Sequence, residues 1–314
     1  MLNWEERRMI VKAAKLYYAE GWTQAQIAKK NGVSRPVISK LLNRAKEEGI
    51  VEVYIKDKTV QTVELEQKLE KKYGLKEVIV TAGAGYTPEM VLRQLGKAGA
   101  SYLSKRLTGN KKIGISWGAS VHALITEYPY ERKEQVHVVP LIGGMGNNFV
   151  HLHSNQLSFH FAQKLNTSCS YLYAPAMVES DDLKNRLTAS KDIAEVLEEG
   201  RNVDIAVVGI GNPVVQSTME KMGYIHENDI ASLKKSQAVG DINSSFFDSL
   251  GHKIDHPLND RVIGLNLEEI NQIPEVVAIV EGAHKINSVH AALTGGYIDV
   301  LITDDSMAQA LAEE

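Results

Sequence analysis

The chain has 314 residues, of which 44% are hydrophobic and 24% are charged, a composition that is typical of globular proteins and sufficient for about two domains. Its single cysteine, Cys169, excludes an internal disulfide and a cysteine-ligated zinc or iron–sulfur site. No apolar run reaches the length of about 18 residues that a membrane helix needs, and the first residues lack the basic-then-apolar order of a secretory signal. We therefore expect a reduced, cytoplasmic protein without a membrane partner.

Charge is distributed unevenly along the chain. Residues 1–58 hold 12 Lys and Arg against 7 Asp and Glu, a net charge of +5, whereas the other 256 residues hold 23 against 32, a net charge of −9. This asymmetry predicts a basic N-terminal module that meets a polyanion, joined to a larger acidic body. On charge alone, a solvated basic helix face is the alternative.

Three helices are predicted in the basic segment. The first spans residues 5–20, and the second spans residues 24–30, between an N-cap at Thr23 and the turn Asn31-Gly32. The third follows an N-cap at Ser34 and ends before Gly49. Its apolar positions are Val37, Ile38, Leu41, Leu42 and Ala45. Residues 50–55 alternate in polarity and are predicted to form a strand, the wing of a winged arrangement.

The second and third helices fit a helix-turn-helix. Ala28 and Gly32 supply the small residue and the turn glycine, and Val33 and Ile38 supply apolar anchors between the crossed helices. We therefore predict that residues 1–58 bind double-stranded DNA, with a protein-interaction module as the alternative. The residues expected at base edges and phosphates are Ser34, Arg35, Pro36, Ser39, Lys40 and Arg44.

The remainder of the chain divides into a linker and an α/β body. Residues 59–74 contain a charged helix with a thin apolar stripe, a linker and a candidate dimer contact. From residue 75 onward apolar strands alternate with amphipathic helices, which predicts a parallel sheet with helices on both faces, a Rossmann-like α/β domain over residues 75–314. The strands are expected at 77–81, 111–116, 136–141, 204–209, 275–281 and 300–303, and the helices at 88–107, 119–127, 153–165, 189–199, 284–295 and 305–312.

The loops after the predicted strands are rich in glycine. In parallel sheets ligands bind at the carboxyl ends of the strands. Four loops lie at predicted strand ends: residues 114–120, 141–148, 209–213 and 281–285. Two shorter segments resemble them in composition: Gly240-Asp241 and Asn259-Asp260-Arg261. The sequence therefore predicts a ligand pocket built from these loops.

The whole chain resembles the SorC family of bacterial transcriptional regulators, including its deoxyribonucleoside regulator and central glycolytic gene regulator branches. The resemblance implies an effector domain akin to glucosamine-6-phosphate deaminase that binds a sugar or phosphosugar without converting it, control of a carbohydrate operon as a repressor, and assembly to dimers or tetramers. Five motifs carry it in chain order: Ile27-Ala28 with Ser34-Arg35-Pro36, Gly114-Ile115-Ser116-Trp117-Gly118, Leu141-Ile142-Gly143-Gly144, Ala238-Val239-Gly240-Asp241-Ile242, and Ala291-Ala292-Leu293-Thr294-Gly295-Gly296.

The residues of the pocket loops agree with such a ligand. Backbone N–H groups at a predicted helix N-terminus favour an anion, and a lysine at another helix start supplies the countercharge. An aspartate and an asparagine are suited to sugar hydroxyls, and a glycine pair lets a ligand approach the backbone. The alternative for each is structural: a turn, a cap or a solvated side chain. The expected effector-binding residues are Gly118, Ala119, Ser120, Gly143, Gly144, Asp241, Asn259 and Lys285.

No cofactor or metal is expected. Some members of the resembled family carry a lysine directly before the Gly-Gly pair, where an amine can condense with an aldehyde, but this chain has Ile142 there. His151, His153 and His160 suggest a metal, yet Asp and Cys partners at ligand spacing are missing.

An enzyme is the rival function. Residues 114–118 match Gly-x-Ser-x-Gly at a strand-to-helix turn, the context of a hydrolase nucleophile, with Asp255 and His256 as candidate partners of Ser116. A sugar-phosphate isomerase or deaminase is the second rival. Because the basic N-terminal module has no role in either enzyme, we expect a regulator without catalytic activity.

Overall fold

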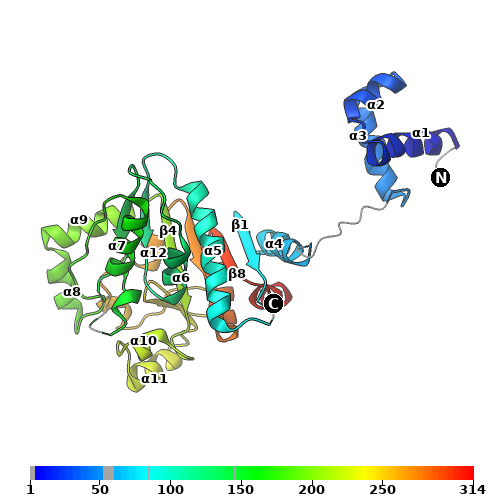
Figure 1. Cartoon of the computed structure of the whole chain (residues 1–314). Coiled ribbons are helices and arrows are strands. Elements are labelled where there is room, and N and C mark those ends of the chain that lie inside the picture. The colour runs from blue at the N-terminus through cyan, green and yellow to red at the C-terminus, as the bar shows by residue number, and fades with distance from the viewer. Residues whose placement is uncertain (1–3, 52–59, 84, 145, 147) are drawn as a thin grey trace. The chain divides into compact units, whose positions relative to one another are not determined.

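The computed structural model describes residues 4–51, 60–83, 85–144, 146 and 148–314. The chain divides into two compact units, residues 1–60 and residues 61–314. Figure 1 shows the helices of the smaller unit in blue and the sheet and helices of the larger unit in the remaining colours. Within the described residues, no helix has the length and apolar character needed to cross a membrane.

Residues 4–51, the described part of the smaller unit, contain three α-helices. They are α1 (Trp4–Ala14), α2 (Gln24–Asn31) and α3 (Arg35–Glu47). The segment predicted as the first helix consists of α1 followed by a π-helical turn over Lys15–Ala19. The helices enclose a small core of buried apolar side chains drawn from all three: Ile10, Ala13, Ala14, Leu16, Ile27, Ala28, Ile38, Leu42 and Ala45.

The turn between α2 and α3 has the predicted chemistry. Thr23 caps α2 in a capping box with Gln26, and Gly32 ends α2 in the left-handed conformation, with φ of 66°, which a residue without Cβ adopts at little cost. Val33, predicted as an apolar anchor, and Val37, predicted as an apolar position of the third helix, are instead 38% and 43% exposed. The buried Ile38 therefore anchors the helix pair without them. Residues 52–55 of the predicted wing strand lie outside the described residues.

The larger unit alternates strands and helices. Its strands are β1 (Glu77–Thr81), β2 (Lys112–Ile115), β3 (His137–Pro140), β4 (Ile205–Gly211), β5 (Gly240–Ile242), β6 (Ser245–Phe247), β7 (Val276–Ile279) and β8 (Val300–Asp304). Its α-helices are α4 (Val60–Tyr73), α5 (Pro88–Arg106), α6 (Ala119–Glu127), α7 (Ser154–Leu165), α8 (Asp181–Thr188), α9 (Lys191–Arg201), α10 (Thr218–Lys221), α11 (Glu227–Lys235), α12 (Leu267–Ile270), α13 (Ile286–Thr294) and α14 (Asp305–Glu313). Short 3-10 turns cover Val150–Leu152, Asn259–Arg261 and Ala283–Lys285.

The sheet is mixed rather than wholly parallel. Six strands pair in the order β1-β8-β7-β4-β2-β3, and each pairing along this path is parallel. The hairpin β5-β6, which the sequence did not predict, joins the end of β4 in antiparallel fashion, with Gly211 opposite Asp241. This hairpin therefore brings a carboxylate to the carboxyl end of the central strand.

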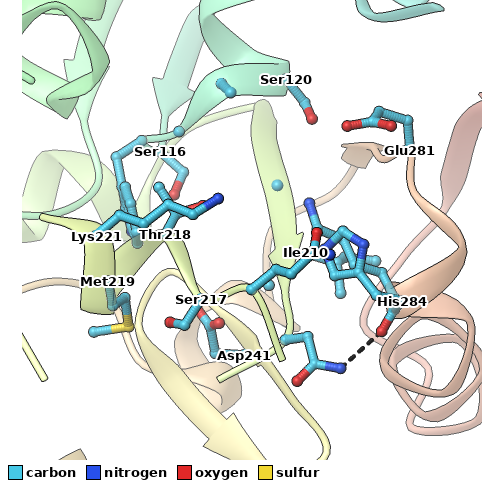
Figure 2. Close-up of a pocket in the computed structure, with 18 of the residues that line it drawn as sticks. Ser116, Ser120, Ile210, Ser217, Thr218, Met219, Lys221, Asp241, Glu281 and His284 are labelled. Carbon is cyan, nitrogen blue, oxygen red and sulfur yellow. Dashed lines mark hydrogen bonds between the residues drawn. The ribbon is translucent and has the colours of Figure 1, made fainter. Parts of the chain in front are cut away.

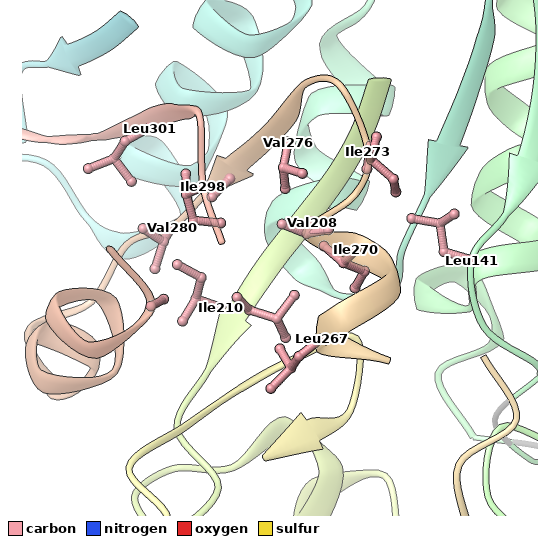
Figure 3. Packing of buried hydrophobic residues seen from close by; sticks show 14 of the residues in the cluster. Leu141, Val208, Ile210, Leu267, Ile270, Ile273, Val276, Val280, Ile298 and Leu301 are labelled. Atoms are coloured by element: carbon pink, nitrogen blue, oxygen red, sulfur yellow. The ribbon is translucent and has the colours of Figure 1, made fainter. Parts of the chain in front are cut away.

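Both faces of the sheet are covered, as predicted. Alternate residues of β4 enter two different cores: Ala206, Val208 and Ile210 on one face, and Ile205 and Val207 on the other. Helices α4, α9, α13 and α14 pack on the first face, and α5, α6 and α7 pack on the second. Figure 3 shows the first core, where apolar side chains from several strands and from α12 meet.

Helix α4, predicted as a linker, packs against the sheet as part of the larger unit. Leu69 is fully buried in the first core. Glu66 and Glu70 accept hydrogen bonds from the backbone N–H groups of Val80 and Val78 on β1, and Figure 1 shows α4 beside that strand.

Candidate functional site

A pocket of about 240 Å³ lies where the carboxyl ends of the central strands meet the starts of two helices. Its walls come from four segments that are distant in sequence: residues 116–120 after β2, residues 209–221 from the end of β4 through α10, Asp241 and Asn243 of the hairpin, and residues 281–285 after β7. Figure 2 shows Glu281 and His284 on one side of the pocket and Lys221 on the other, extending towards its centre. The pocket lies at the strand ends, where the sequence predicts ligand binding.

The N-terminus of α6 forms one wall. Gly118, the N-cap, has φ of 116°, a conformation that favours glycine, and its N–H donates to Leu152 O at 3.0 Å. The first N–H groups of a helix have no intrahelical acceptor, and here Ala119 and Ser120 line the pocket. This wall therefore offers backbone donors and the positive end of a helix dipole.

Asp241 forms the floor. Its side chain is only 6% exposed, and burial raises the pKa of this carboxyl group to about 6, opposed by a hydrogen bond from Ser244 N–H and by Lys285. The opposing strand position is Gly211, where a Cβ atom would come within 2.0 Å of Asp241 Oδ1. Glycine is thus required at position 211 for the carboxylate to reach the pocket.

Lys285 ends the 3-10 turn that precedes α13. Burial lowers the pKa of its ammonium group, and the nearby carboxylates of Glu281 and Asp241 oppose this shift. Burial likewise raises the pKa of Glu281. Asn212 holds the turn in place, because its Nδ2 donates to His284 O at 2.7 Å, the bond drawn as the dashed line in Figure 2. Its Oδ1 accepts from Val214 and Val215 N–H.

Several lining residues were not predicted. They come from the loop after β4, the short helix α10 and the hairpin: Gln216, Ser217, Thr218, Met219, Lys221 and Asn243. Asn212, Glu281 and His284 lie in loops that the sequence predicts to build the pocket, although they are not among the expected effector-binding residues. Lys221 adds a second cation to the pocket. Because ligands bind at the ends of parallel strands, Gly209 and Gly211 pointed to the loop after β4. Helix α10, however, has only four residues, too few for a helical periodicity to be recognised.

Three of the eight predicted effector residues lie outside this pocket. Asn259 is buried elsewhere, with its amide bonded to the backbone of Phe246 and Ile254, so it stabilises the hairpin. Gly143 permits a close approach of the chain to itself, because a Cβ there would lie 2.5 Å from Ala174 O. Gly144 is hydrogen-bonded to the same segment through Ala174 O.

The hydrolase interpretation of Ser116 is not supported by its surroundings. Ser116 is 1% exposed, and its hydroxyl donates to Asn243 Oδ1 at 2.7 Å. The candidate base His256 is bonded to Ser232 instead, with Nε2 2.9 Å from the hydroxyl oxygen. Ser116 and Asn243 therefore form a structural pair that joins the end of β2 to the hairpin, because Asn243 Nδ2 also donates to Leu141 O and Leu265 O.

The three histidines weighed as metal ligands, His151, His153 and His160, have different surroundings. His153 is buried and bonded to Asn148 O, whereas His151 is exposed and His160 is half-buried. Among the described residues, no group of three or more His, Cys, Asp or Glu side chains is placed to hold a metal ion.

Helix α3 carries the residues predicted at DNA. Ser34, Arg35, Pro36 and Lys40 are exposed, and Ser39 and Arg44 are half-buried. The buried side of the helix is Ile38, Leu42 and Ala45, so the polar and basic residues occupy the remaining surface.

Comparisons with known proteins agree with both units. A family of sugar-binding domains matches residues 57–313, and a family of homeodomain-like domains matches residues 3–53. The chain is 33% identical to the deoxyribonucleoside regulator of Bacillus subtilis over 99% of each chain. It is 32% identical to the sorbitol operon regulator of Klebsiella pneumoniae, again over 99% of each.

Solved structures show the same likeness. The full-length sorbitol operon regulator SorC from Klebsiella pneumoniae superposes with a TM-score of 0.78 at 31% identity, over 98% of this chain and 99% of that one. A DeoR family transcriptional regulator from Listeria monocytogenes superposes with a TM-score of 0.76 at 44% identity, over 80% of this chain and 99% of that one. These relatives are transcriptional regulators and not enzymes. The chain therefore belongs to the SorC family of transcriptional regulators, with an N-terminal helix-turn-helix unit and a sugar-binding α/β domain.

Proposed function

We propose that this regulator binds operator DNA through α3 as a homo-oligomer and releases it when a phosphorylated sugar occupies the pocket described above. The observation that carries the proposal is the meeting of the α6 N-terminus with Lys285 and Lys221 in one pocket. The kinship with glucosamine-6-phosphate deaminase that the sequence resemblance implies is part of this proposal. Relatives named for deoxyribonucleosides and sorbitol support a carbohydrate operon as the target.

The cationic groups favour an anionic ligand. The N–H groups at Ala119 and Ser120 and the helix dipole attract an anion, and two lysines line the same pocket. Burial strengthens such an attraction because fewer water molecules screen it. A phosphate ester satisfies these donors better than a neutral sugar does.

The acidic groups favour hydroxyls on the same ligand. Asp241 and Glu281 are hydrogen-bond acceptors when ionised, and both line the pocket. Carboxylates would repel a ligand that is anionic throughout. A sugar phosphate, with its anionic group and its hydroxyls at different ends, matches both sets of side chains.

The experiment measures the thermal stability of the full chain with pentose and hexose phosphates, with the corresponding unphosphorylated sugars and with inorganic phosphate. A bound ligand at 100 times its dissociation constant stabilises the folded state by about 2.7 kcal/mol. We expect a phosphorylated sugar to stabilise the wild-type chain and to lower its affinity for operator DNA.

Lys285→Ala should abolish both effects while leaving DNA binding by the free protein intact, because Lys285 lies in the larger unit. Lys191→Ala, which removes an exposed lysine on α9, is the matched control. Gly118→Val tests the helix wall independently, since φ of 116° strains any side chain there. An unchanged effector response in both Lys285→Ala and Gly118→Val would contradict the proposed anion site.

A further inference from the structure

The larger unit contains a second pocket, of about 270 Å³, that shares no lining residue with the pocket beside the α6 N-terminus. Its walls come from α8 and α9, from Ser245 on β6 and from residues between 259 and 269. One water molecule takes about 30 Å³ in the liquid. The second pocket therefore has room for a small organic molecule.

One wall of the second pocket carries backbone groups without partners. Residues 262–265 pair with neighbouring segments along one edge, where the N–H groups of Ile263 and Leu265 donate to carbonyl oxygens. Alternate residues of an extended chain direct their N–H and C=O groups to opposite edges. Those of Val262 and Gly264 therefore point to the other edge, and both residues line the second pocket. Among the described residues, none of these four groups has a hydrogen-bond partner.

Ser245 adds a hydroxyl group that is also unpartnered. The residue is only 2% exposed and lines the second pocket, and no hydrogen bond joins its Oγ to any residue that the structure describes. The hydroxyl of the adjacent Ser244, by contrast, accepts from Trp117 Nε1 at 3.1 Å. Burying a polar group without a hydrogen bond costs free energy. An unpartnered hydroxyl in the wall of a cavity therefore indicates a ligand that bonds to it.

Lys184 supplies the charge that a ligand can use. It is half-buried and lines the second pocket, and within the described part of the chain its ammonium group has no ion pair or hydrogen bond. The other charged lining groups are matched. Arg201 Nε donates to Glu269 Oε1 at 2.6 Å, and its Nη1 donates to Glu198 Oε2 at 3.0 Å. Glu269 Oε2 accepts from Asn266 N–H. The wall is thus left with a single uncompensated positive charge.

We propose that the second pocket binds a small hydroxycarboxylate, a molecule with one carboxylate and at least one hydroxyl group. The carboxylate matches the charge of Lys184 and accepts hydrogen bonds from backbone N–H groups. The hydroxyls bond to Ser245 and to the free carbonyl oxygens of Val262 and Gly264. A phosphate ester brings about 1.5–2 negative charges, more than this wall compensates.

The hairpin β5-β6 connects the two pockets. Asp241 and Asn243 line the pocket beside the α6 N-terminus, and Ser245 lines the second. Asn243 Nδ2 donates at 2.9 Å to Leu265 O, directly after Gly264 in the chain. A carboxylate in the second pocket contacts the same hairpin as the sugar phosphate of the proposed function, so the regulator gains a second input. The site itself stands on residues that the proposed function does not use.

The test measures binding to the full chain by isothermal titration calorimetry. The probes are lactate, glycerate and gluconate, with glycerol and inorganic phosphate as uncharged and more highly charged counterparts. We expect at least one hydroxycarboxylate to bind and glycerol not to bind. Lys184→Ala should weaken that binding by about 10–100-fold, because it removes a charge-assisted hydrogen bond. Lys191→Ala is the matched control, since its side chain is 84% exposed on the neighbouring helix α9.

Ser245→Ala tests the opposite wall. It should also weaken carboxylate binding, yet leave the free energy of unfolding of the ligand-free chain unchanged, because no hydrogen bond within the protein is lost.

Lys285→Ala separates the two pockets, because it alters only the one beside the α6 N-terminus. Carboxylate binding that persists in Lys285→Ala and weakens in Lys184→Ala supports the second site. The reverse pattern would overturn it, as would the absence of binding by all three carboxylates. Tighter Lys184-dependent binding of inorganic phosphate than of any carboxylate would overturn the ligand class. The response to sugar phosphate is measured separately and does not depend on Lys184, so each of these results leaves the proposed function standing.

Discussion

Tyr73 Oη lies 2.8 Å from His290 Nδ1, so the last turn of α4 is tied to the middle of α13. The two rings meet edge to face, with centroids 5.8 Å apart, and Tyr73 also donates to Leu311 O on α14. Helix α13 begins directly after Lys285 of the pocket. A movement of Lys285 on ligand binding would therefore reach α4, which precedes the larger unit's sheet and follows the DNA-binding unit in sequence.

We predict that Tyr73→Phe weakens the coupling between effector and DNA while leaving each binding step almost unchanged. The substitution keeps the ring and removes the hydroxyl, whose hydrogen bonds are worth about 0.5–1.5 kcal/mol. Allosteric coupling in general amounts to about 1–3 kcal/mol, so a substantial part of it is at stake. The measurement is operator affinity by fluorescence anisotropy with and without the phosphorylated sugar found in the stability screen.

Tyr130→Phe serves as the control for this variant, since Tyr130 is 83% exposed. Equal effector responses in wild type, Tyr73→Phe and Tyr130→Phe would show that the signal does not pass through the α4–α13 contact. A loss of DNA binding without effector would instead make Tyr73 a purely structural residue.

The strands of the parallel path are predictable because both faces of the sheet are covered. A strand that is buried on both sides consists of an uninterrupted apolar run, as in Val276–Ile279. The hairpin β5-β6 gives no such signal, because each strand has three residues. Its turn residues Asn243 and Ser244 have φ of 52° and 64°, a conformation that sequence patterns associate with glycine.

The pocket residues are predictable only where they follow from the alternation of strands and helices. Loop glycines and helix starts locate Gly118, Ala119, Ser120 and Lys285, since both features follow from the strand-helix alternation. Residue type cannot tell whether a polar side chain serves a ligand or the backbone. Asn259 and Asn212 both use their amides to bond the backbone, but only Asn212 also lines the pocket beside the α6 N-terminus.

We predict that Arg35→Ala lowers specific DNA binding by about 1–3 kcal/mol, with a smaller effect on random DNA, if Arg35 reads a base edge. Arg35 is exposed at the start of α3. The probe is a duplex selected from random sequence by the wild-type chain, and the competitor is a scrambled duplex at the same salt concentration. Lys46→Ala, which removes one positive charge from the exposed end of the same helix, controls for charge alone.

Equal losses on the selected and scrambled duplexes would make Arg35 a phosphate contact. Unchanged affinity for both would contradict the assignment of α3 as the reading helix. Duplexes whose half-sites are moved apart by half a helical turn should also bind more weakly, because a symmetric assembly faces the same side of the DNA.

We predict that Ser116→Ala lowers the free energy of unfolding by about 1 kcal/mol and changes no hydrolytic rate. The variant removes the buried hydrogen bond to Asn243 Oδ1, and a lost buried bond of this kind costs about 0.5–1.5 kcal/mol. Urea unfolding measures the first effect, and ester hydrolysis assays measure the second. Ester turnover that depends on Ser116 would support the hydrolase interpretation.

We predict that Asp241→Asn stabilises the ligand-free chain above pH 6. In the folded protein burial raises the pKa of Asp241 from 3.8 to about 6, so the folded state carries the cost of a buried charge once the group ionises. A shift of this size corresponds to about 3 kcal/mol at neutral pH. The wild type therefore loses stability as the pH rises from about 3.8 towards 6 and stays at the lower stability above that, whereas asparagine stays neutral and still accepts the Ser244 N–H bond.

The stability difference between Asp241→Asn and wild type should thus be largest at pH 7.5 and shrink as the pH falls from 6 towards 3.8, where aspartate is protonated in both the folded and the unfolded chain. Urea unfolding at several pH values measures it, with Asp182→Asn as control because the Asp182 side chain is 80% exposed. Asp241→Asn should also bind the sugar phosphate more weakly, since it loses a carboxylate acceptor in the pocket. A variant that is less stable than wild type at pH 7.5 would show that the carboxylate supports the fold, and its raised pKa would then not reflect a site kept for a ligand.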